Sequence, residues 1–433
     1  MFARGRVAQE VSDRAWLRAM LDFEAALARA TAPEEAAAAI AAACAEPGGF
    51  DIGEIGRSSA DAGTPVPGLL KALRAKLPGE AAAHVHRGAT SQDVVDTAAM
   101  LVAKRALSPL LDDMLGAADA CASLAERFRD APMAGRTLLQ QALPITFGLE
   151  AAGWLIGLVE ARMELTRVRD ESLALQLGGA VGTLASLGDD GLTVVRDVAR
   201  DLELAEPPLP WHTHRERSVR LACALGEAAG AMGKVARDVE LLAQTEVGEA
   251  AEGGGPGRGG SSTLPHKRNP VGAVAVTACA ARVPGLVSTM LASMAQEHER
   301  AAGAWQAEWE TLSDLLRLTG SAAAALRELL EGLEPDPARM RANLDATGGL
   351  LMTESVVAAL TPSLGRAQAQ ELVESAAQRA LSDGRPVRDV LLELPQVREV
   401  LGPDGVDAAL APEGYLGAAG QLIDRALAAH RAV

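Results

Sequence analysis

A seven-position apolar seam between Arg215 and Glu249 constrains the fold more than any other feature of the sequence. Its positions alternate steps of three and four residues, and they are Ala222, Leu225, Ala229, Met232, Ala236, Val239 and Ala243. This period predicts a long helix that buries one stripe. Because four of the seven side chains are alanine, neighbouring helices can approach closely, so the seam predicts a tight bundle.

Other segments repeat the helical pattern. Long helices are expected over residues 91–129, 144–169, 271–294 and 305–333. A first helix is expected to begin at Ser12 or Asp13. Between residues 46 and 78, recurring glycine and proline predict loops with short helical turns at most. Only 3% of the residues are aromatic, and a chain rich in Ala, Leu and Val favours an all-α fold over a β-sandwich.

The length of 433 residues suggests about three domains at roughly 150 residues each. Residues 1–98 are expected to form a mostly helical N-terminal domain and residues 99–345 a central helical bundle. After Gly348 and Gly349 the helices become shorter and are interrupted by prolines. Residues 346–433 are therefore expected to form a small C-terminal helical domain.

Charge and composition exclude several classes of function. The net charge of −16 argues against nucleic-acid binding, because a phosphate backbone would be repelled. The four cysteines form no CxxC pair, so neither a metal site nor a disulfide framework is expected. The longest uncharged stretch, residues 172–188, is too short for a membrane span, and the N-terminus lacks a secretory pattern. We therefore expect a cytoplasmic protein without a membrane partner.

Three polar segments are not required by bundle packing. The first, residues 84–93 (HVHRGATSQD), precedes a predicted long helix. Thr90 or Ser91 can cap that helix and leave backbone N–H groups available to a carboxylate. An ordinary capping turn explains this segment equally well when it is taken by itself.

The second polar segment, GRTLLQQALP, covers residues 135–144. Arg136, Thr137 and Gln140 supply hydrogen-bond donors just ahead of Pro144, which we expect at the first position of a helix. An arginine can bind a carboxylate bidentately. A solvated loop is the alternative interpretation.

In the third polar segment, six of the eight residues from Gly253 to Gly260 are glycine. A dinucleotide-binding loop is excluded because a helix precedes the glycines, and a Walker A loop is excluded because Gly260 stands where its lysine should be. The glycines predict a mobile loop that delivers the side chains after it, which include Ser261, Ser262, Lys267 and Asn269. Capping of the next turn by the two serines is the alternative.

Together the three segments resemble the fumarase/aspartase superfamily, whose members carry a TS-x-D element, a GRT-x-x-Q element and a GSS-x-x-P-x-K-x-N loop in this order. Here these are residues 90–93, 135–140 and 260–269. The resemblance covers nearly the whole chain. It implies an all-α, three-domain fold with a central bundle of long helices, and a homotetramer in which three subunits contribute to each active site.

Within this superfamily the chain is most similar to bacterial 3-carboxy-cis,cis-muconate cycloisomerases. The similarity rests on residues 210–213 (PWHT), the glycine-rich run, the HKRNP exit and residues 296–309. Many fumarase-like lyases have a histidine where this chain has Leu138, whereas the bacterial cycloisomerases lack it. The resemblance implies closure of a carboxymuconolactone by a substrate carboxylate, through an aci-carboxylate intermediate, in the β-ketoadipate pathway of protocatechuate-type aromatic catabolism.

The resemblance also implies roles for individual residues. Ser261 is expected to transfer the proton, with its alkoxide stabilised in a site closed to water. The side chains expected to bind the carboxylates of a small polycarboxylate are Thr90, Ser91, Arg136, Thr137, Gln140, Lys267 and Asn269. Arg136 can support or grip them. No metal and no cofactor are expected.

Four further residues are possible contributors, namely His86, His212, Arg215 and Ser262. A buried structural histidine is nearly as good an interpretation of His86 and His212, and Arg215 can instead pair with an acid. Two other functions remain open. One is elimination from a substituted succinate, such as a nitrosuccinate- or adenylosuccinate-like substrate. The other is a non-catalytic helical scaffold.

Overall fold

The computed structural model describes residues 2–253, 259–260, 263–264 and 266–432. Contacts divide the chain into two compact units, and each unit is assembled from three separate stretches. Unit 1 comprises residues 1–115, 160–233 and 275–327, and unit 2 comprises residues 116–159, 234–274 and 328–433. The predicted boundaries after residues 98 and 345 remain a prediction.

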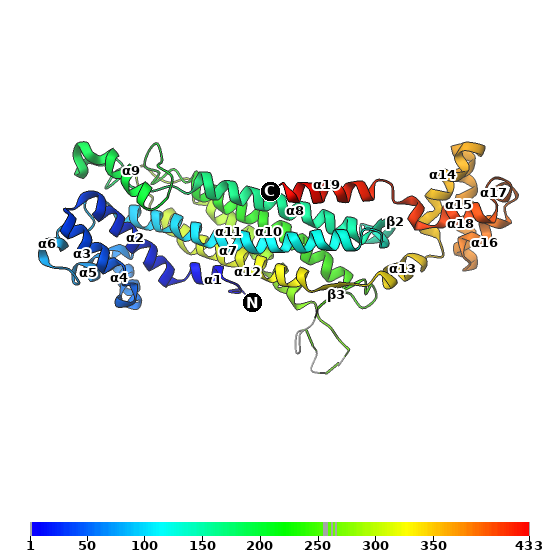
Figure 1. Ribbon diagram of the computed structural model, residues 1–433, viewed down its shortest axis with the longest axis horizontal. Helices are drawn as coiled ribbons and strands as arrows, with labels where there is room; N and C mark the ends of the chain where they lie inside the picture. Colours follow the sequence, from blue (N-terminus) through cyan, green and yellow to red (C-terminus); the bar gives the residue numbers. More distant parts are fainter. Residues whose placement is uncertain (1, 254–258, 261–262, 265, 433) are drawn as a thin grey trace. The chain divides into compact units, whose positions relative to one another are not determined.

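Long helices dominate the chain, as the sequence predicted, and each contributes to both units (Figure 1). They are α7 (Ser91–Arg127), α8 (Phe147–Ser172), α10 (Glu216–Leu242), α11 (Val271–Ala292) and α12 (Ala304–Glu331). The seam on α10 is buried from Ala222 to Val239, and Ala243 lies just beyond the helix. A Cβ atom added at Gly226 would lie 3.0 Å from Val287 of α11. Small residues therefore bring α10 and α11 together closely within unit 1.

The beginning of unit 1 consists of shorter helices. They are α1 (Val7–Glu10), α2 (Asp13–Thr31), α3 (Glu34–Cys44), α4 (Ile52–Ala62), α5 (Val66–Arg74) and α6 (Gly79–Ala82). Ser12 caps α2 by accepting a hydrogen bond from the Ala15 amide at 3.3 Å, which confirms the predicted start. α2 packs against α3 and against α9 (Gly191–Asp201).

The prediction of loops between residues 46 and 78 was wrong, because α4 and α5 lie there. The Asp51 carboxylate caps α4 by accepting from the Glu54 amide at 3.0 Å. Pro67 lies in the first turn of α5, where a proline lacks no needed hydrogen bond. The frequent glycines and prolines therefore concealed two helices, of which α4 has a side-chain cap.

Unit 2 contains two small antiparallel sheets. They pair β1 (Pro132–Thr137) with β2 (Gln140–Thr146) and β3 (Ala250–Glu252) with β4 (Leu333–Pro335). The first sheet replaces both the helix start expected at Pro144 and the alternative of a solvated loop over residues 135–144. Pro144 pairs with Ala134 inside β2 and does not begin a helix, so α8 starts three residues later, at Phe147.

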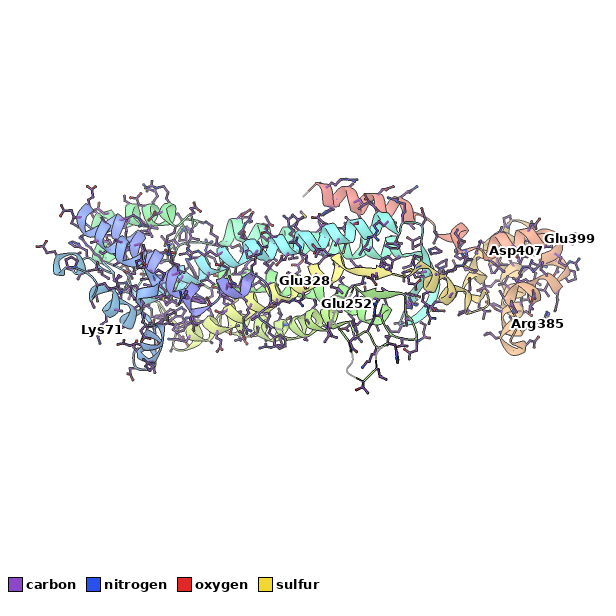
Figure 2. All side chains as sticks on the ribbon, turned by 60° about the horizontal axis from the view of Figure 1, so that its bottom comes forward. Lys71, Glu252, Glu328, Arg385, Glu399 and Asp407 are labelled. Carbon is purple, nitrogen blue, oxygen red and sulfur yellow. The ribbon has the colours of Figure 1, made fainter. Side chains whose placement is uncertain are left out.

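The C-terminal part of unit 2 is made of short helices, as predicted. They are α13 (Pro337–Asp345), α14 (Thr353–Leu364), α15 (Arg366–Asp383), α16 (Val387–Glu393), α17 (Pro395–Val400), α18 (Gly402–Leu410) and α19 (Ala419–Arg431). Helices α14 to α18 enclose an apolar core that includes Val356, Leu360, Val373 and Leu391. Charged side chains such as Arg385, Glu399 and Asp407 lie on the exposed side of this cluster (Figure 2).

Helix α11 is long and apolar enough, by length and composition, to cross a membrane, whereas the sequence predicted no span. Its most apolar window has a mean hydropathy of 1.6, and 33% of that window is buried. Arg282, near the middle of the helix, lies 3.6 Å from Asp314 of α12. A charge at this position is expensive in hydrocarbon, so the ion pair favours a helix that packs against protein.

Candidate active site

The TS-x-D element forms the start of α7 in unit 1. The Asp93 carboxylate accepts a hydrogen bond from the Thr90 amide at 2.9 Å, three residues back, as the acid of a capping box does. Thr90 and Ser91 are half-buried at this corner. The capping-turn interpretation therefore describes Asp93, and the Thr90 hydroxyl is left for another interaction.

Asp93 is fully buried and accepts hydrogen bonds from three further donors. The amides of Gly178 and Gly179 donate to it at 3.0 and 2.9 Å, and His212 Nε2 approaches it at 2.8 Å. A carboxylate cannot donate, so Nε2 of His212 carries the proton. From the sequence, His212 was a possible site residue. In the structure it is buried and holds Asp93, which in turn binds the Thr90 amide.

Arg215 lies below the same corner and is also buried. Its guanidinium contacts Asp96 at 2.8 Å and Glu308 at 2.6 Å. Burial lowers the pKa of Arg215, but the two carboxylates outweigh burial and raise it. Desolvation in turn raises the pKa of Glu308, against the lowering effect of Arg215. A single guanidinium is thus shared by two buried carboxylates, and Arg215 pairs with acids as the alternative interpretation proposed.

His86 precedes the corner and has a left-handed backbone, with φ of 65°. Its Nδ1 lies 2.7 Å from Oε1 of Glu24, whose side chain is buried in α2. Left-handed non-glycine residues carry backbone strain that surrounding contacts must offset. The pair with Glu24 supplies such a contact, so His86 is held in place.

Arg300 is a neighbour of Thr90 that the sequence did not single out as a site residue. It lies between α11 and α12, and its NH1 group donates to Thr90 Oγ1 at 3.2 Å. The local sequence around Arg300 does not indicate this contact, because the two residues are 210 positions apart in the chain. In the sequence, the one indication of Arg300 was that residues 296–309 contribute to the similarity with the cycloisomerases.

The GRT element lies in unit 2, on the hairpin of β1 and β2. Arg136 forms a bidentate ion pair with Glu249, whose side chain is buried, with N–O distances of 2.8 and 2.7 Å. Asn343 of α13 donates to the same carboxylate at 2.7 Å. Glu249 therefore occupies the fork of Arg136, and of the two predicted roles the geometry favours support of the hairpin.

The tip of this hairpin is exposed. Thr137 pairs with Gln140, so Leu138 and Leu139 form a two-residue turn. Both have positive φ, 52° and 65°, as a type I′ turn requires. Their exposed fractions are 97% and 72%. The Arg136–Glu249 ion pair holds the base of the hairpin, and the side chains of Thr137 and Gln140 at its tip are exposed to solvent.

The third element begins after β3 in unit 2. Asn269 donates through its backbone and side-chain nitrogens to the Gly259 carbonyl, at 2.9 and 3.0 Å. Lys267 is exposed. Glu252, at the base, accepts from the amides of Gly272 and Ala273 and so caps α11. Ser261 and Ser262 lie outside the described residues.

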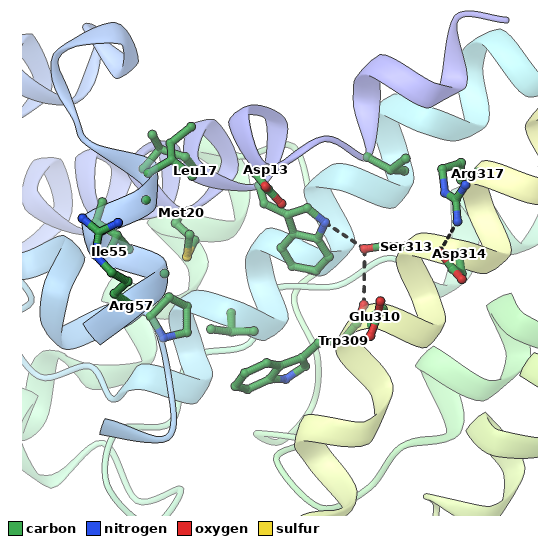
Figure 3. Close-up of a pocket in the computed structure, with 17 residues that line it drawn as sticks. Asp13, Leu17, Met20, Ile55, Arg57, Trp309, Glu310, Ser313, Asp314 and Arg317 are labelled. Atoms are coloured by element: carbon green, nitrogen blue, oxygen red, sulfur yellow. Dashed lines mark hydrogen bonds and ion pairs between the residues drawn. The ribbon is translucent and has the colours of Figure 1, made fainter. Parts of the chain in front are cut away.

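A cavity of about 670 Å³ has no lining residue from these three elements. Figure 3 shows the side chains that line it. The cavity lies in unit 1 between α2, α4 and α12, and side chains of Trp16, Met20, Ile55 and Trp309 line it. Trp16 donates to Ser313 Oγ at 3.0 Å across its wall. Val95, one turn after Ser91, is its lining residue nearest to the TS-x-D element in sequence. Two of its lining side chains, Asp314 and Arg317, form an ion pair with each other.

A second cavity of about 160 Å³ lies in unit 2 below the third element, beside Asn269 and Glu252. Cavities of this size are smaller than typical ligand pockets of roughly 300 Å³ or more. Among the described residues, no group of three His, Cys, Asp or Glu side chains is placed to hold a metal ion.

Comparison with known proteins agrees with this architecture. Residues 3–285 match a family model described as "Lyase", and residues 349–426 match one described as "Adenylosuccinate lyase C-terminus". The chain belongs to the fumarase/aspartase superfamily. This superfamily member is 48% identical to the 3-carboxy-cis,cis-muconate cycloisomerase of Bradyrhizobium diazoefficiens, over 96% of this chain and 94% of the relative.

Two other relatives of this superfamily member inform the choice of substrate. The nitrosuccinate lyase of Streptomyces davaonensis is 46% identical, over 96% of this chain and 91% of the relative. The crystal structure of the 3-carboxy-cis,cis-muconate lactonizing enzyme from Pseudomonas putida superposes with a TM-score of 0.95 at 45% identity, over 98% of this chain and 97% of that one. The predicted helical fold is thereby confirmed.

Proposed function

We propose that the chain is a 3-carboxy-cis,cis-muconate cycloisomerase. The observation that carries the proposal is the nearly full-length similarity to such enzymes, in a chain that retains all three motif elements. The Thr90 corner supports it, because a hydroxyl is held in place there beside an arginine. Leu138 agrees with the proposal, because the resemblance implies that the cycloisomerases lack the histidine that many fumarase-like lyases have at this position.

In the proposed reaction, one carboxylate oxygen of the substrate attacks a carbon of its own double bond and closes a five-membered lactone. Negative charge then spreads from the adjacent carbon onto its carboxylate. Ser261 adds a proton to that carbon, and solvent finally replaces this proton, so a trianion becomes a dianion. The protein must orient the diene and stabilise the developing charge. Lys267, Asn269, Thr137 and the Thr90–Ser91 pair are proposed as the stabilising groups, and Gln140 as a further donor.

The first test is substrate consumption. Lactone closure removes the conjugated diene, so the ultraviolet absorbance of 3-carboxy-cis,cis-muconate is expected to fall when the protein is added. Ser261→Ala is expected to lower kcat by about 100- to 10,000-fold, because it removes a positioned proton donor. Ser382→Ala, on the exposed surface of α15, is the matched control and is expected to leave kcat unchanged. Near-normal turnover by Ser261→Ala would remove Ser261 from this role.

Lys267→Ala tests carboxylate binding separately. Loss of one charged donor is expected to lower kcat/KM by about 10- to 100-fold. Lys71→Ala is the control, because Lys71 is an exposed residue of α5. An unchanged kcat/KM in Lys267→Ala would show that its ammonium group does not contact the substrate.

A second candidate function is elimination from a substituted succinate, which the 46% identity to a nitrosuccinate lyase favours. The two functions separate in one panel. A nitrosuccinate lyase would release nitrite from nitrosuccinate and leave 3-carboxymuconate unchanged. That result would replace the first proposal with the second.

We also propose a homotetramer with shared active sites, acting in the cytoplasm in aromatic catabolism. Helix α11 supports association, because most of its apolar window is unburied in one chain and Val274 and Leu291 are 44% and 49% exposed. Apolar area of this kind is normally covered by protein. Sedimentation of the full chain measures the assembly, and a monomer at micromolar concentration would contradict the tetramer.

A further inference from the structure

Arg300 is fixed in orientation by two acceptors in unit 1. Its Nε donates to Gln92 Oε1 and its NH1 to Thr90 Oγ1, both at 3.2 Å. Gln92 is fully buried, and its amide nitrogen donates to Asp96 at 3.1 Å and to the His212 carbonyl at 2.8 Å. The amide oxygen of Gln92 must therefore face Arg300. The guanidinium is consequently held against the Thr90 hydroxyl.

The remaining edge of this guanidinium has no partner in the part of the chain that the structure describes. NH2 of Arg300 is shielded from solvent and finds no acceptor, and no described carboxylate lies within 4.0 Å of the side chain. A shielded donor without an acceptor destabilises the folded protein. An anion that binds beside Thr90 would supply the missing acceptor and the missing negative charge.

Two other arginines near the motif elements do not have this property. Arg136 is neutralised by Glu249, and Arg215 is neutralised by Asp96 and Glu308. Of these three guanidinium groups, that of Arg300 alone retains a charge without a matching acid among the described residues. It also lies against the hydroxyl of the TS-x-D element.

The backbone that carries Arg300 is strained and anchored. His298 has φ of 46°, and its carbonyl accepts from Thr213 Oγ1 at 2.7 Å. Glu297 accepts from the Ala302 amide at 3.1 Å. Strained residues persist only where surrounding contacts hold them, and they cluster at ligand-binding sites. These contacts hold the segment from both sides of Arg300.

We propose that Arg300 binds the third carboxylate of a tricarboxylate substrate and thereby sets the preference for tricarboxylates over dicarboxylates. This assignment rests on the proposed function, because that function places Thr90 at the substrate. Arg300 lies outside the three shared motif elements, so it can match the substituent in which substrates of the superfamily differ. The Thr90 hydroxyl accepts from Arg300 and keeps its own hydrogen to donate to the same carboxylate.

Two inhibitors that differ by one carboxylate test the assignment. Propane-1,2,3-tricarboxylate is glutarate with a central carboxylate added, and calorimetry on the full-length assembled protein gives the Kd of each. Arg300→Ala is expected to weaken binding of the tricarboxylate by about 10- to 100-fold, as loss of a charge-assisted hydrogen-bond pair does. Binding of glutarate is expected to change by less than about threefold.

Two further variants keep the test decisive. Arg300→Lys retains the charge but cannot bridge both Gln92 and a ligand, so an intermediate loss of tricarboxylate affinity is expected even if Arg300→Ala folds poorly. Arg200→Ala removes a guanidinium of α9 whose side chain is 75% exposed, and both Kd values are expected to remain unchanged.

Equal losses for both ligands in Arg300→Ala, or no loss for either, would overturn the third-carboxylate assignment while leaving the proposed function intact. Equal affinity of the wild-type protein for the two ligands would overturn it as well. Failure of the wild-type protein to bind either ligand and to consume 3-carboxymuconate would instead overturn the proposed function, and the assignment with it.

Discussion

The Thr90 corner of unit 1 and the Arg136 hairpin of unit 2 both carry motif residues, but they are built differently. Near Thr90, Asp93 is buried and accepts hydrogen bonds from His212 and from backbone amides, and Arg215 is buried and donates to the Asp96 and Glu308 carboxylates. In the hairpin, one buried ion pair holds a tip whose side chains face solvent.

The difference shows that a motif residue need not contact a ligand. Asp93 shapes the corner from below, and Arg136 is occupied by Glu249. The groups left free to bind are Thr90 and Arg300 at the corner and Thr137 and Gln140 at the tip. If this contrast is correct, substitutions below Thr90 change global stability, whereas substitutions in the hairpin act locally.

Arg215→Ala is expected to have the largest effect. It leaves the Asp96 and Glu308 carboxylates buried without their cation, which typically lowers the free energy of unfolding by about 3–5 kcal/mol. Urea unfolding of the purified protein measures this loss. Arg200→Ala, whose ion pair with Asp197 is exposed, is the control and is expected to change stability by less than about 0.5 kcal/mol. Equal losses in the two variants would show that the buried pairs contribute nothing special.

Arg136→Ala is expected to come second, with a loss of about 2–3 kcal/mol, because Glu249 keeps a hydrogen bond from Asn343. The loss should appear mainly as faster amide hydrogen exchange in β1 and β2. Arg136→Lys retains a charge near Glu249 and should show a smaller increase. Uniformly faster exchange throughout the protein would contradict a local role and break the contrast with Arg215.

The dependence of stability on pH should differ in sign between buried and exposed acids. Desolvation raises the pKa of Glu308, so the folded state binds the proton more tightly than the unfolded state does. The free energy of unfolding therefore falls as pH rises through the folded pKa, and Glu308→Gln should remove this fall. The bond from Arg388 lowers the pKa of exposed Asp407, so its stabilisation is lost as pH falls, and Asp407→Asn should remove that loss. Urea unfolding across acidic pH measures both slopes, and equal signs would contradict the burial argument.

The sequence predicted the features that follow from a regular spacing of apolar residues and from a local capping residue. The α10 seam, the long helices and the Ser12 cap were confirmed. Helices α4 and α5 were missed because their glycines and prolines suggested loops, although Asp51 marks the start of α4. The hairpin was missed because Leu138 and Leu139 occupy a turn where Asn-Gly would have indicated one.

The site was predictable only as far as its local motifs. The three elements could be located, and Thr90 or Ser91 was a candidate cap, but the bond from the Thr90 amide to Asp93 was not predicted. The partner of Arg136 could not be predicted, because Glu249 lies 113 residues away and no period relates the two. The same holds for Arg300 and Thr90, which meet only through the packing of the chain. The placement of the residues in the three elements as substrate ligands stays a prediction.

Leu138→Asn with Leu139→Gly gives the smallest expected effect and tests the tip directly. Both leucines have positive φ and are exposed in one chain, so the favoured type I′ pair should raise the free energy of unfolding by about 1 kcal/mol. Leu192→Asn, an exposed leucine on α9 without positive φ, should give no gain. A loss of stability in the double variant would mean that the leucines bury apolar surface in the assembled protein, since they are 97% and 72% exposed in one chain. A gain in stability with a loss of kcat/KM would instead show that the strained turn is retained for its contact with substrate.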